Sequence, residues 1–223
     1  MEQAISFTEE NYLKTIYSLA KQNKGKIANL SIAEKLRINP ATVTEMLKKL
    51  NDKNLIDYNR IDGAALTPQG QSLALKVIRK HRLWETFLVN KLSFNWDEVH
   101  EIAEQLEHIQ SDKLIRQLDK LLGFPKFDPH GDPIPDKNGQ LPQSQTFPLV
   151  TVEEPGTTYK LIGVANHTTA FLQYLDKIKM TINDKIEIKE IHEFDHSMVI
   201  RIGNRTPVMI SSEVAKNLLV SDQ

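Results

Sequence analysis

The sequence contains no cysteine and no long apolar run. Without cysteine it can form no disulfide, thiolate nucleophile, iron–sulfur cluster or zinc–thiolate site. No apolar run approaches the roughly 20 residues that span a bilayer, and the first twelve residues lack the basic and apolar segments of a secretory signal. We therefore expect a cytoplasmic protein that does not associate with membranes.

Net charge is also nearly absent, at −1 over 223 residues, but the charge is unevenly distributed. Residues 1–83 hold 14 Lys and Arg against 8 Asp and Glu, whereas residues 84–223 hold 14 against 21. A basic amino-terminal third favours a partner that is a polyanion. A merely solvated charged surface is the simpler alternative.

The amino-terminal third has the order of elements of a winged helix-turn-helix. Apolar residues recur at helical spacing from Phe7 to about Gln22, and Ser31 begins a second short helix. Pro40 suits the first turn of a third helix, and Asp62-Gly63 between two strand-like runs predicts a hairpin. This order favours a DNA-binding domain with the third helix in the major groove; the alternative is a small helical domain that packs against another protein.

The outward side of the third helix supports the DNA interpretation. Small polar residues near its start can approach base edges, and its lysines can meet phosphates. These side chains are Ala41, Thr42, Thr44, Glu45, Lys48 and Lys49.

Beyond the hairpin, two long helices are predicted to begin at Pro68 and Asp97, the second broken near Ser111. Their apolar surface suggests a core plus a self-association face, unless all of it packs within one subunit. A loop over 124–148 holds six of the ten prolines. Short alternating runs from Tyr159, with one helix from about Thr168 to Lys179, predict a small β-barrel. The apolar set comprises Trp84, Phe87, Leu88, Leu114, Ile115, Leu118, Leu121 and Leu122.

Histidine and glutamate gather on the same two helices. His81 and Glu85 share one helix face, and a second stripe of His and Glu is separate from the apolar stripe of its helix. The stripe is too long for one ion, so His81, Glu85 and His100 predict one site, and Glu104, Glu107 and His108 predict another. Imidazole and carboxylate without thiolate suit Mn²⁺, Fe²⁺, Co²⁺ or Zn²⁺. A solvated acidic helix is the alternative.

Enzyme motifs are missing from the predicted helices. The sequence has no Gly-x-Ser-x-Gly and no glycine-rich phosphate loop, and its one His-Glu-x-x-His run, at residues 192–196, lies between two strand-like runs and not on the helix that the zinc-protease motif requires. A Glu-x-x-His step occurs only within that run, whereas di-iron bundles carry it on two helices. A metal site beside a DNA-binding domain therefore indicates a sensor and not an enzyme.

Several runs together resemble the diphtheria-toxin-repressor family of metal-dependent transcriptional regulators, including its manganese-responsive branch. The resemblance is strong over about residues 7–136 and continues more loosely through 159–220, which is similar to the family's SH3-like, FeoA-type domain. It implies a mainly α protein with winged helix-turn-helix (1–73), helical dimerisation and metal-binding (74–140), and linker plus FeoA-type (141–223) domains. The matching runs are NYLKTIY, PATVTEMLKKL, LTPQGQSLA, RKHRLWETFL, WDEVHEIAEQLEHI and DPHGDPIP.

The resemblance also implies site residues. Asn11 stands where the manganese branch has Asp and the iron branch Met, and Glu104 stands where iron regulators have Cys. The primary site implied is Asn11, Glu104, Glu107 and His108; the ancillary site is His81, Glu85 and His100, with Asp128, His130, Asn166 and His167 as further candidates. The DNA-contacting set is Asn39, Ala41, Thr42, Thr44, Glu45, Lys48 and Lys49, with Arg60 in the hairpin.

The function that follows is a homodimeric repressor that binds a palindromic operator and controls metal-uptake genes. Mn(II) is the expected cofactor, Fe(II) the alternative, and Zn(II) or Co(II) are expected to bind in vitro. No small-molecule substrate is expected. Two other functions stay open from the residues alone: a winged-helix regulator that answers an organic ligand, and a metalloenzyme with a fused helix-turn-helix.

Overall fold

The structure is a computed structural model that describes residues 5–22 and 25–222. The chain divides into two compact units, and each is described by itself. The first unit holds the chain up to His81 together with Glu104–Asp112 and Pro135–Gln140. The second holds Arg82–Ala103, Lys113–Ile134 and the chain from Leu141 onward. No helix among the described residues is long and apolar enough to cross a membrane.

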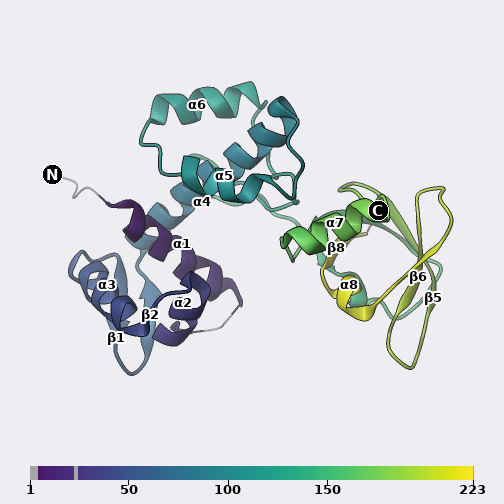
Figure 1. Cartoon of the computed structure of the whole chain (residues 1–223), viewed down its shortest axis with the longest axis horizontal. Helices are drawn as coiled ribbons and strands as arrows, with labels where there is room; N and C mark the ends of the chain where they lie inside the picture. The colour runs from purple at the N-terminus through teal and green to yellow at the C-terminus, as the bar shows by residue number, and fades with distance from the viewer. Residues whose placement is uncertain (1–4, 23–24, 223) are drawn as a thin grey trace. The chain divides into compact units, whose positions relative to one another are not determined.

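The first unit begins with the predicted winged helix-turn-helix (Figure 1). Its apolar core includes Leu13, Ile16, Ile32, Val43 and Leu47, all fully buried. Each comes from the apolar stripe of its helix, so burial of these stripes against one another holds the three helices together. The elements are α1 (Phe7–Gln22), α2 (Asn29–Leu36), α3 (Pro40–Asp52), β1 (Ile56–Asn59) and β2 (Gly63–Leu66).

Local signals explain the start of α3 and the hairpin. The Asn39 side chain caps α3 by accepting a hydrogen bond from the Ala41 amide at 2.8 Å, and Pro40 occupies the first turn. Strands β1 and β2 pair antiparallel from Ile56↔Leu66 to Asn59↔Gly63. Gly63 has φ +96°, and a Cβ there would lie 2.4 Å from the Ile27 carbonyl oxygen, so only glycine fits. The predicted helix-turn-helix and wing are confirmed.

The long helix α4 (Pro68–Leu92) follows with the bounds that the sequence predicts. The Thr67 hydroxyl accepts a hydrogen bond from the Gly70 amide at 3.1 Å and so caps its first turn. The next predicted helix is divided into α5 (Val99–Leu106) and α6 (Asp112–Leu121), which confirms the break near Ser111.

Helix α6 is strongly amphipathic, and only part of its apolar face is covered. Leu118 is buried, whereas Leu114, Leu121 and nearby Phe124 are 40%, 58% and 65% exposed. An apolar stripe of this kind on one chain is typical of a surface that a partner covers.

The carboxyl-terminal part is a six-stranded antiparallel sheet with the order β3-β8-β4-β5-β6-β7. Its core is formed by the inward residues of the alternating runs, among them Leu161, Ile186, Ile188 and Ile200. The elements are β3 (Phe147–Pro148), η1 (Leu149–Thr151), β4 (Thr158–Val164), α7 (Thr169–Lys177), β5 (Lys185–Ile191), β6 (Met198–Ile202), β7 (Val208–Ile210), α8 (Ser212–Lys216) and β8 (Leu218–Ser221).

Some predicted boundaries were wrong. Helix α2 begins at Asn29, not at Ser31, because Ala28 is the extended residue whose carbonyl accepts the first helical bond from Ile32 at 3.3 Å. Helix α5 begins at Val99, not at Asp97, because the amide of Asn95 and the Glu98 carboxylate close a turn before it. The sequence also gave no sign of η1, α8 and β8.

Candidate metal centre and DNA-binding face

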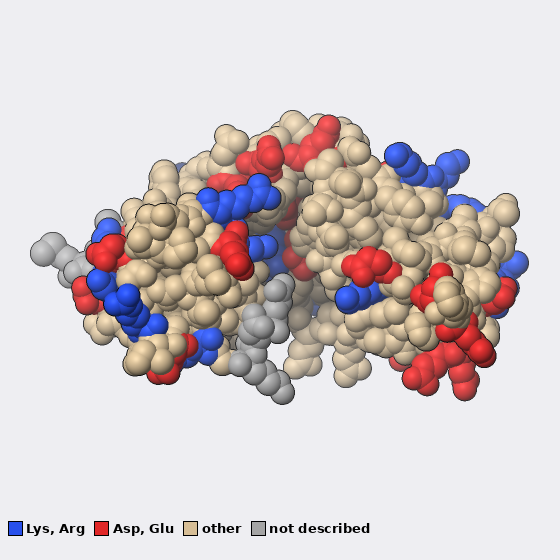
Figure 2. Space-filling model, turned by 60° about the horizontal axis from the view of Figure 1, so that its bottom comes forward, with Lys and Arg blue, Asp and Glu red and all other residues tan. Residues whose placement is uncertain are grey.

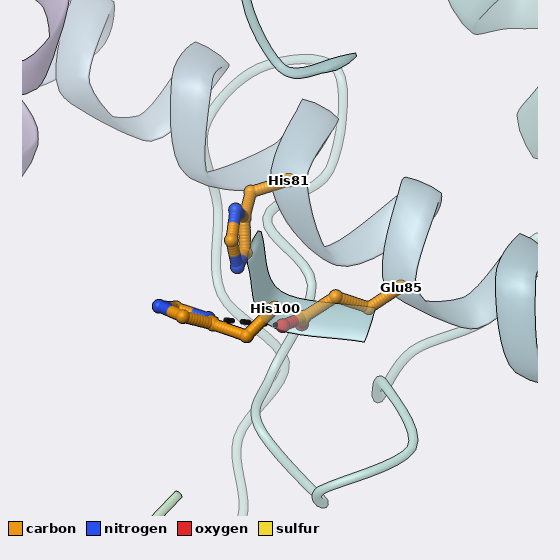
Figure 3. Close-up of side chains that lie close together, drawn as sticks. All are labelled: His81, Glu85 and His100. Carbon is orange, nitrogen blue, oxygen red and sulfur yellow. Dashed lines mark hydrogen bonds and ion pairs between the residues drawn. The ribbon is translucent and has the colours of Figure 1, made fainter. Parts of the chain in front are cut away.

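Glu85, a buried residue of α4, is the centre of the first group of possible metal ligands. His100 Nδ1 on α5 lies 3.4 Å from Glu85 Oε1, and His81 lies one turn before Glu85 on α4 (Figure 3). One ligand atom from each of the three lies within 4.8 Å of the others. The predicted ancillary residues are therefore brought together by helical spacing and by the contact of α4 with α5.

The same carboxylate belongs to a second group with Asp128 and His130, and all three residues are buried. His130 Nδ1 lies 3.8 Å from Glu85 Oε2 and 3.9 Å from Asp128 Oδ1. His130 Nε2 lies 2.8 Å from the Trp96 carbonyl oxygen, which can only accept, so Nε2 carries the proton. The lone pair of the neutral ring is then on Nδ1, which is buried and has no hydrogen-bond partner within the described part of the chain.

The 126–135 loop holds Asp128 and His130 in place through its own backbone. Asp128 Oδ1 accepts hydrogen bonds from the amides of His130 and Asp132 at 2.8 and 2.9 Å. Arg82 on α4 donates to Asp132 Oδ2 at 2.8 Å and to the Pro133 carbonyl oxygen at 2.5 Å. One arginine thus fixes the loop to the helix that carries Glu85.

The electrostatics of this group favour a cation. Burial raises the pKa of Asp128 well above its usual value, and the carboxylates of Glu85 and Asp132 raise it further. Burial also lowers the pKa of His130, which keeps the ring neutral. Two crowded carboxylates and an unpartnered imidazole nitrogen form a donor set that a divalent ion would satisfy. These residues therefore fit a metal ion.

The third-domain candidates lie near this group but are engaged elsewhere. The His167 ring stacks on His130 with centroids 4.8 Å apart, while its Nε2 lies 3.0 Å from the Val164 carbonyl oxygen. Asn166 Oδ1 accepts hydrogen bonds from the amide and hydroxyl of Thr168 at 2.9 and 2.8 Å. In this conformation His167 covers the ring of His130, and Asn166 closes a turn before α7.

The predicted primary residues are differently arranged. Glu107 is fully buried; its Oε1 lies 2.6 Å from Lys14 Nζ, and its Oε2 lies 2.6 Å from His81 Nδ1. Burial alone would raise the pKa of Glu107, but His81 and Lys14 lower it below the usual value. Glu104, more exposed, has its Oε1 at 3.3 Å from the same ammonium. These carboxylates are paired with a protein cation.

The first helix meets this site through Glu10, a residue that sequence reasoning missed. Glu10 Oε2 lies 2.5 Å from His108 Nδ1, and its Oε1 accepts from Gln110 Nε2 at 2.8 Å and faces Lys80 Nζ at 3.5 Å. Asn11, the predicted ligand, is half-buried, and no hydrogen bond of its side chain is found among the described residues. Glu10 and Lys14 are four residues apart on α1, so helical spacing could have placed both on one face.

The two regions thus differ in their fit to a metal ion. Both groups of three or more ligands found among the described residues contain Glu85, and neither contains Glu107. Around Glu107 the conformation satisfies the carboxylates with Lys14 and His81 instead. The predicted site around Glu104, Glu107 and His108 is brought together in space but not as a set of free ligands.

The candidate DNA-contacting residues lie on one side of α3 and at the hairpin. Ala41, Thr42, Glu45, Lys48 and Lys49 are exposed, as are Asn39 and the hairpin residue Arg60. Lys48 Nζ and Glu45 Oε1 form an ion pair at 2.9 Å. Figure 2 shows blue and red side chains interspersed on the left of the view, so the basic balance of this part is not a face of one sign there.

Thr44 is tied to the rest of the domain. Its hydroxyl donates to the Pro40 carbonyl oxygen at 3.1 Å and accepts from Asn29 Nδ2 at 3.1 Å. The same Asn29 amide donates to the Tyr58 hydroxyl on β1 at 2.9 Å. Asn29 therefore connects α2 to α3 and to strand β1 of the hairpin.

A second residue that sequence reasoning missed, Glu9, links the start of α1 to the end of α3. Glu9 is 1% exposed, and its Oε1 lies 2.7 Å from Lys53 Nζ and 3.2 Å from Lys49 Nζ. Burial alone would raise its pKa, but the ammonium of Lys53, a hydrogen bond from the Ser6 amide and the ammonium of Lys49 lower the pKa to about 2. The acidic pair Glu9-Glu10 in the first turn was the sequence signal that could have drawn attention to both residues.

Comparisons with known proteins agree with this architecture. Three family models match consecutive parts of the chain. The iron dependent repressor N-terminal DNA binding domain matches residues 5–64, the iron dependent repressor metal binding and dimerisation domain residues 67–136, and the FeoA domain residues 148–222. The expected fold class, including its FeoA-type third part, is confirmed.

Among curated proteins, the iron-dependent repressor IdeR of Mycobacterium tuberculosis (strain ATCC 25618 / H37Rv) is 37% identical over 128 residues, which cover 57% of this chain and 55% of IdeR. The diphtheria toxin repressor of Corynebacterium glutamicum is 34% identical over 128 residues, covering 57% of this chain and 56% of that repressor. The chain therefore spans about half the length of these curated relatives. Both are named as repressors, not as enzymes.

Solved structures match over nearly the whole chain. A manganese-dependent transcriptional repressor in complex with manganese is 33% identical, with a TM-score of 0.86, over 96% of this chain and 100% of that one. ScaR with bound Cd²⁺ is also 33% identical, with a TM-score of 0.79, over 96% of this chain and 99% of its own. Fold, sequence and domain order agree, and the chain belongs to the diphtheria-toxin-repressor family of metal-dependent transcriptional regulators.

Proposed function

We propose that this protein is a metal-dependent DNA-binding repressor that senses Mn(II), with Fe(II) as the alternative, and controls genes for metal uptake. The observation that carries the proposal is the buried group of Glu85, Asp128 and His130 in a chain that also has a winged helix-turn-helix. Among the described residues, His130 Nδ1 in this group has no hydrogen-bond partner. We also propose that the domain boundaries lie after residues 73 and 140. The protein is proposed to be cytoplasmic.

The donor chemistry supports the choice of ion. Carboxylate oxygens and imidazole nitrogens without thiolate suit Mn²⁺ and Fe²⁺, and Zn²⁺ or Co²⁺ are expected to bind the same donors in vitro. Glu85, Asp128 and His130 would hold the ion, while His100 faces the other carboxylate oxygen of Glu85 and His81 belongs to the group that contains His100. When bound, the ion would supply a double positive charge, and the chain supplies the loop and the helix that carry its ligands.

The structure of the first unit supports a route from ligand binding to DNA. Glu107 holds α1 through Lys14, His108 holds it through Glu10, and Glu9 holds the end of α3. Any change in how α1 is held therefore changes how α3 is held. Because a ligand shifts an equilibrium only through its different affinity for the two conformations, we propose that the ion favours the arrangement in which α3 fits DNA.

The DNA-bound form is proposed to be a homodimer. The apolar stripe of α6, with Leu114 and Leu121 largely exposed, is the surface that we propose a second copy covers. Two recognition helices related by twofold symmetry would read half-sites about 34–36 Å apart. A palindromic operator is therefore the expected partner, and no small-molecule substrate is expected.

The test is selection of duplex DNA from a random library by the full chain with Mn²⁺, followed by fluorescence anisotropy on the selected sequence. Binding should be strong with Mn²⁺ or Fe²⁺ and should be lost with chelator. A His130→Ala variant should lose most of this response, whereas His196→Asn, at an exposed turn, should keep it. Equal DNA binding with metal and with chelator would reject metal sensing.

A further inference from the structure

Lys14 is placed where a cation is needed. Its Nζ lies 2.6 Å from Glu107 Oε1 and 3.3 Å from Glu104 Oε1, and only 19% of its side chain is exposed. Glu107 is fully buried, and a buried carboxylate without a partner is costly. The ammonium of Lys14 therefore stabilises the metal-free form of this site.

Glu107 Oε1, the oxygen that Lys14 contacts, also faces the His108 imidazole, which is a predicted metal ligand. His108 Nε2 lies 3.8 Å from Glu107 Oε1, the atom that Lys14 contacts. An ion about 2.2 Å from that oxygen would lie within about 5 Å of the ammonium. Two like charges so close in a partly buried site repel strongly, so the ion and the ammonium compete for one oxygen.

Lys14 can leave without a change of backbone. Its ammonium stands on a flexible four-carbon stem, and part of the side chain already reaches solvent. The second lysine of the cluster, Lys80, faces Glu10 at 3.5 Å and does not contact Glu107. Around Glu85, Arg82 holds Asp132 and the Pro133 carbonyl oxygen, and its Nε lies 3.6 Å from Asp128 Oδ2. His130 Nδ1 there has no hydrogen-bond partner among the described residues.

We propose that Lys14 is an internal competitor of the metal ion at Glu104, Glu107 and His108. An ion at this site must displace the ammonium from Glu107, so the site fills only at higher metal concentration than the group around Glu85. Lys14 thus sets the metal concentration at which the contact between α1 and Glu107 is broken. This inference rests on the proposed metal sensing and names the residue that determines its threshold.

The test is a titration of the full chain with Mn²⁺ alone at constant pH, in which free Mn²⁺ is measured by its electron paramagnetic resonance signal. The wild type should bind in two phases, with Glu85→Gln removing the tight phase and Glu107→Gln removing the weak one. In Lys14→Met the Kd of the weak phase should fall by about tenfold or more, because the competing charge is gone. The Kd of the tight phase should stay unchanged.

Lys76→Met is the matched control, since Lys76 is an exposed residue of α4 and its replacement removes the same charge. Lys14→Gln, which can still donate a hydrogen bond to Glu107, serves if Lys14→Met does not fold, and should shift the weak phase in the same direction. A Kd for the weak phase within twofold of wild type in the folded variant, or an equal shift in Lys76→Met, would overturn the role of Lys14.

The outcomes separate the two proposals. If wild type binds Mn²⁺ and its DNA binding responds, but the weak phase does not move in Lys14→Met, only the competitor role is rejected. If neither wild type nor Lys14→Met binds Mn²⁺, the proposed metal sensing fails as well. A single phase in wild type and two phases in Lys14→Met would support the competitor role.

Discussion

The carboxylate of Glu9, in the first turn of α1, lies 2.7 Å from the ammonium of Lys53, the residue that follows the end of α3. Glu9 is 1% exposed, so this ion pair is shielded from solvent on the side of the carboxylate. This ion pair joins α1, whose Lys14 contacts Glu107, to α3, which carries most of the candidate DNA-contacting residues. The first prediction concerns this connection.

Replacing Glu9 by Gln should lower the free energy of unfolding by about 1–3 kcal/mol, because Lys53 and Lys49 lose a charged acceptor. DNA affinity should also fall, since α3 is no longer held by α1. Urea denaturation and fluorescence anisotropy measure the two effects. Glu34→Gln, at an exposed position of α2, is the control and should change neither. Unchanged stability of Glu9→Gln would contradict the assignment.

The same residue predicts a dependence on pH. The folded protein holds the pKa of Glu9 at about 2, below the ordinary glutamate value of 4.5. A lowered pKa contributes stability above the unfolded pKa, and this contribution is lost as pH falls from about 4.5 to about 2. The difference in free energy of unfolding between wild type and Glu9→Gln should therefore shrink over that range. A constant difference from pH 6 to pH 2 would mean that Glu9 is not the group involved.

Asp128, whose pKa is shifted in the opposite direction to that of Glu9, predicts a pH dependence of metal binding. Burial and the neighbouring Glu85 and Asp132 raise the pKa of Asp128, so the metal-free protein holds it protonated to higher pH than an ordinary aspartate. An ion then displaces a proton, and Mn²⁺ affinity should rise with pH. Asp128→Asn should weaken binding about 10- to 100-fold and flatten this pH dependence. Calorimetry in two buffers of different ionisation enthalpy measures the proton released; no release in wild type would argue against the assignment.

Gly131 predicts a steric effect on stability. It has φ +86°, and a Cβ there would lie 2.0 Å from the Ile162 carbonyl oxygen. Gly123 also has positive φ, at +75°, but a Cβ there meets nothing within 4 Å. Gly123→Ala should cost about 1–2 kcal/mol from the backbone alone, and Gly131→Ala clearly more. Thermal melting compares the pair, and equal losses would mean that the loop can move away.

Arg60 predicts a contact with the DNA backbone. It is exposed at the end of β1, where the wing would follow the phosphates. Arg60→Met should weaken binding to all sequences alike and lower the slope of log affinity against log salt by about one. Thr42→Val, on the exposed side of α3, should instead change the preference among sequences. Anisotropy at several salt concentrations distinguishes the two effects.

The sequence predicted the elements whose signals are local. Helical spacing gave α1, Asn39-Pro40 gave the start of α3, and Asp62-Gly63 gave the hairpin, because caps and turns depend on neighbouring residues. Strand β8 was missed because it is short and pairs with β4, more than fifty residues earlier. Such pairing leaves no pattern within the strand itself.

The candidate site was predicted in part for the same reason. The spacing of His81 and Glu85 on one helix predicted their shared face, and the structure brings both residues together with His100. The partners of Glu107 and His108 are Lys14 and Glu10, which come from a helix about 90 residues away in the sequence. Periodicity predicts which face a residue occupies but not which distant side chain meets it.

The amide of Asn29 has a consequence for how the protein meets a duplex. One side chain bonds both Thr44 and Tyr58, so the reading helix and the hairpin are held at a fixed separation before any encounter. Docking then requires little additional ordering of this domain, and the entropy lost on association is correspondingly smaller. The spacing between α3, which would enter the DNA groove, and the hairpin, which would follow the DNA backbone, is thus already set in the free protein.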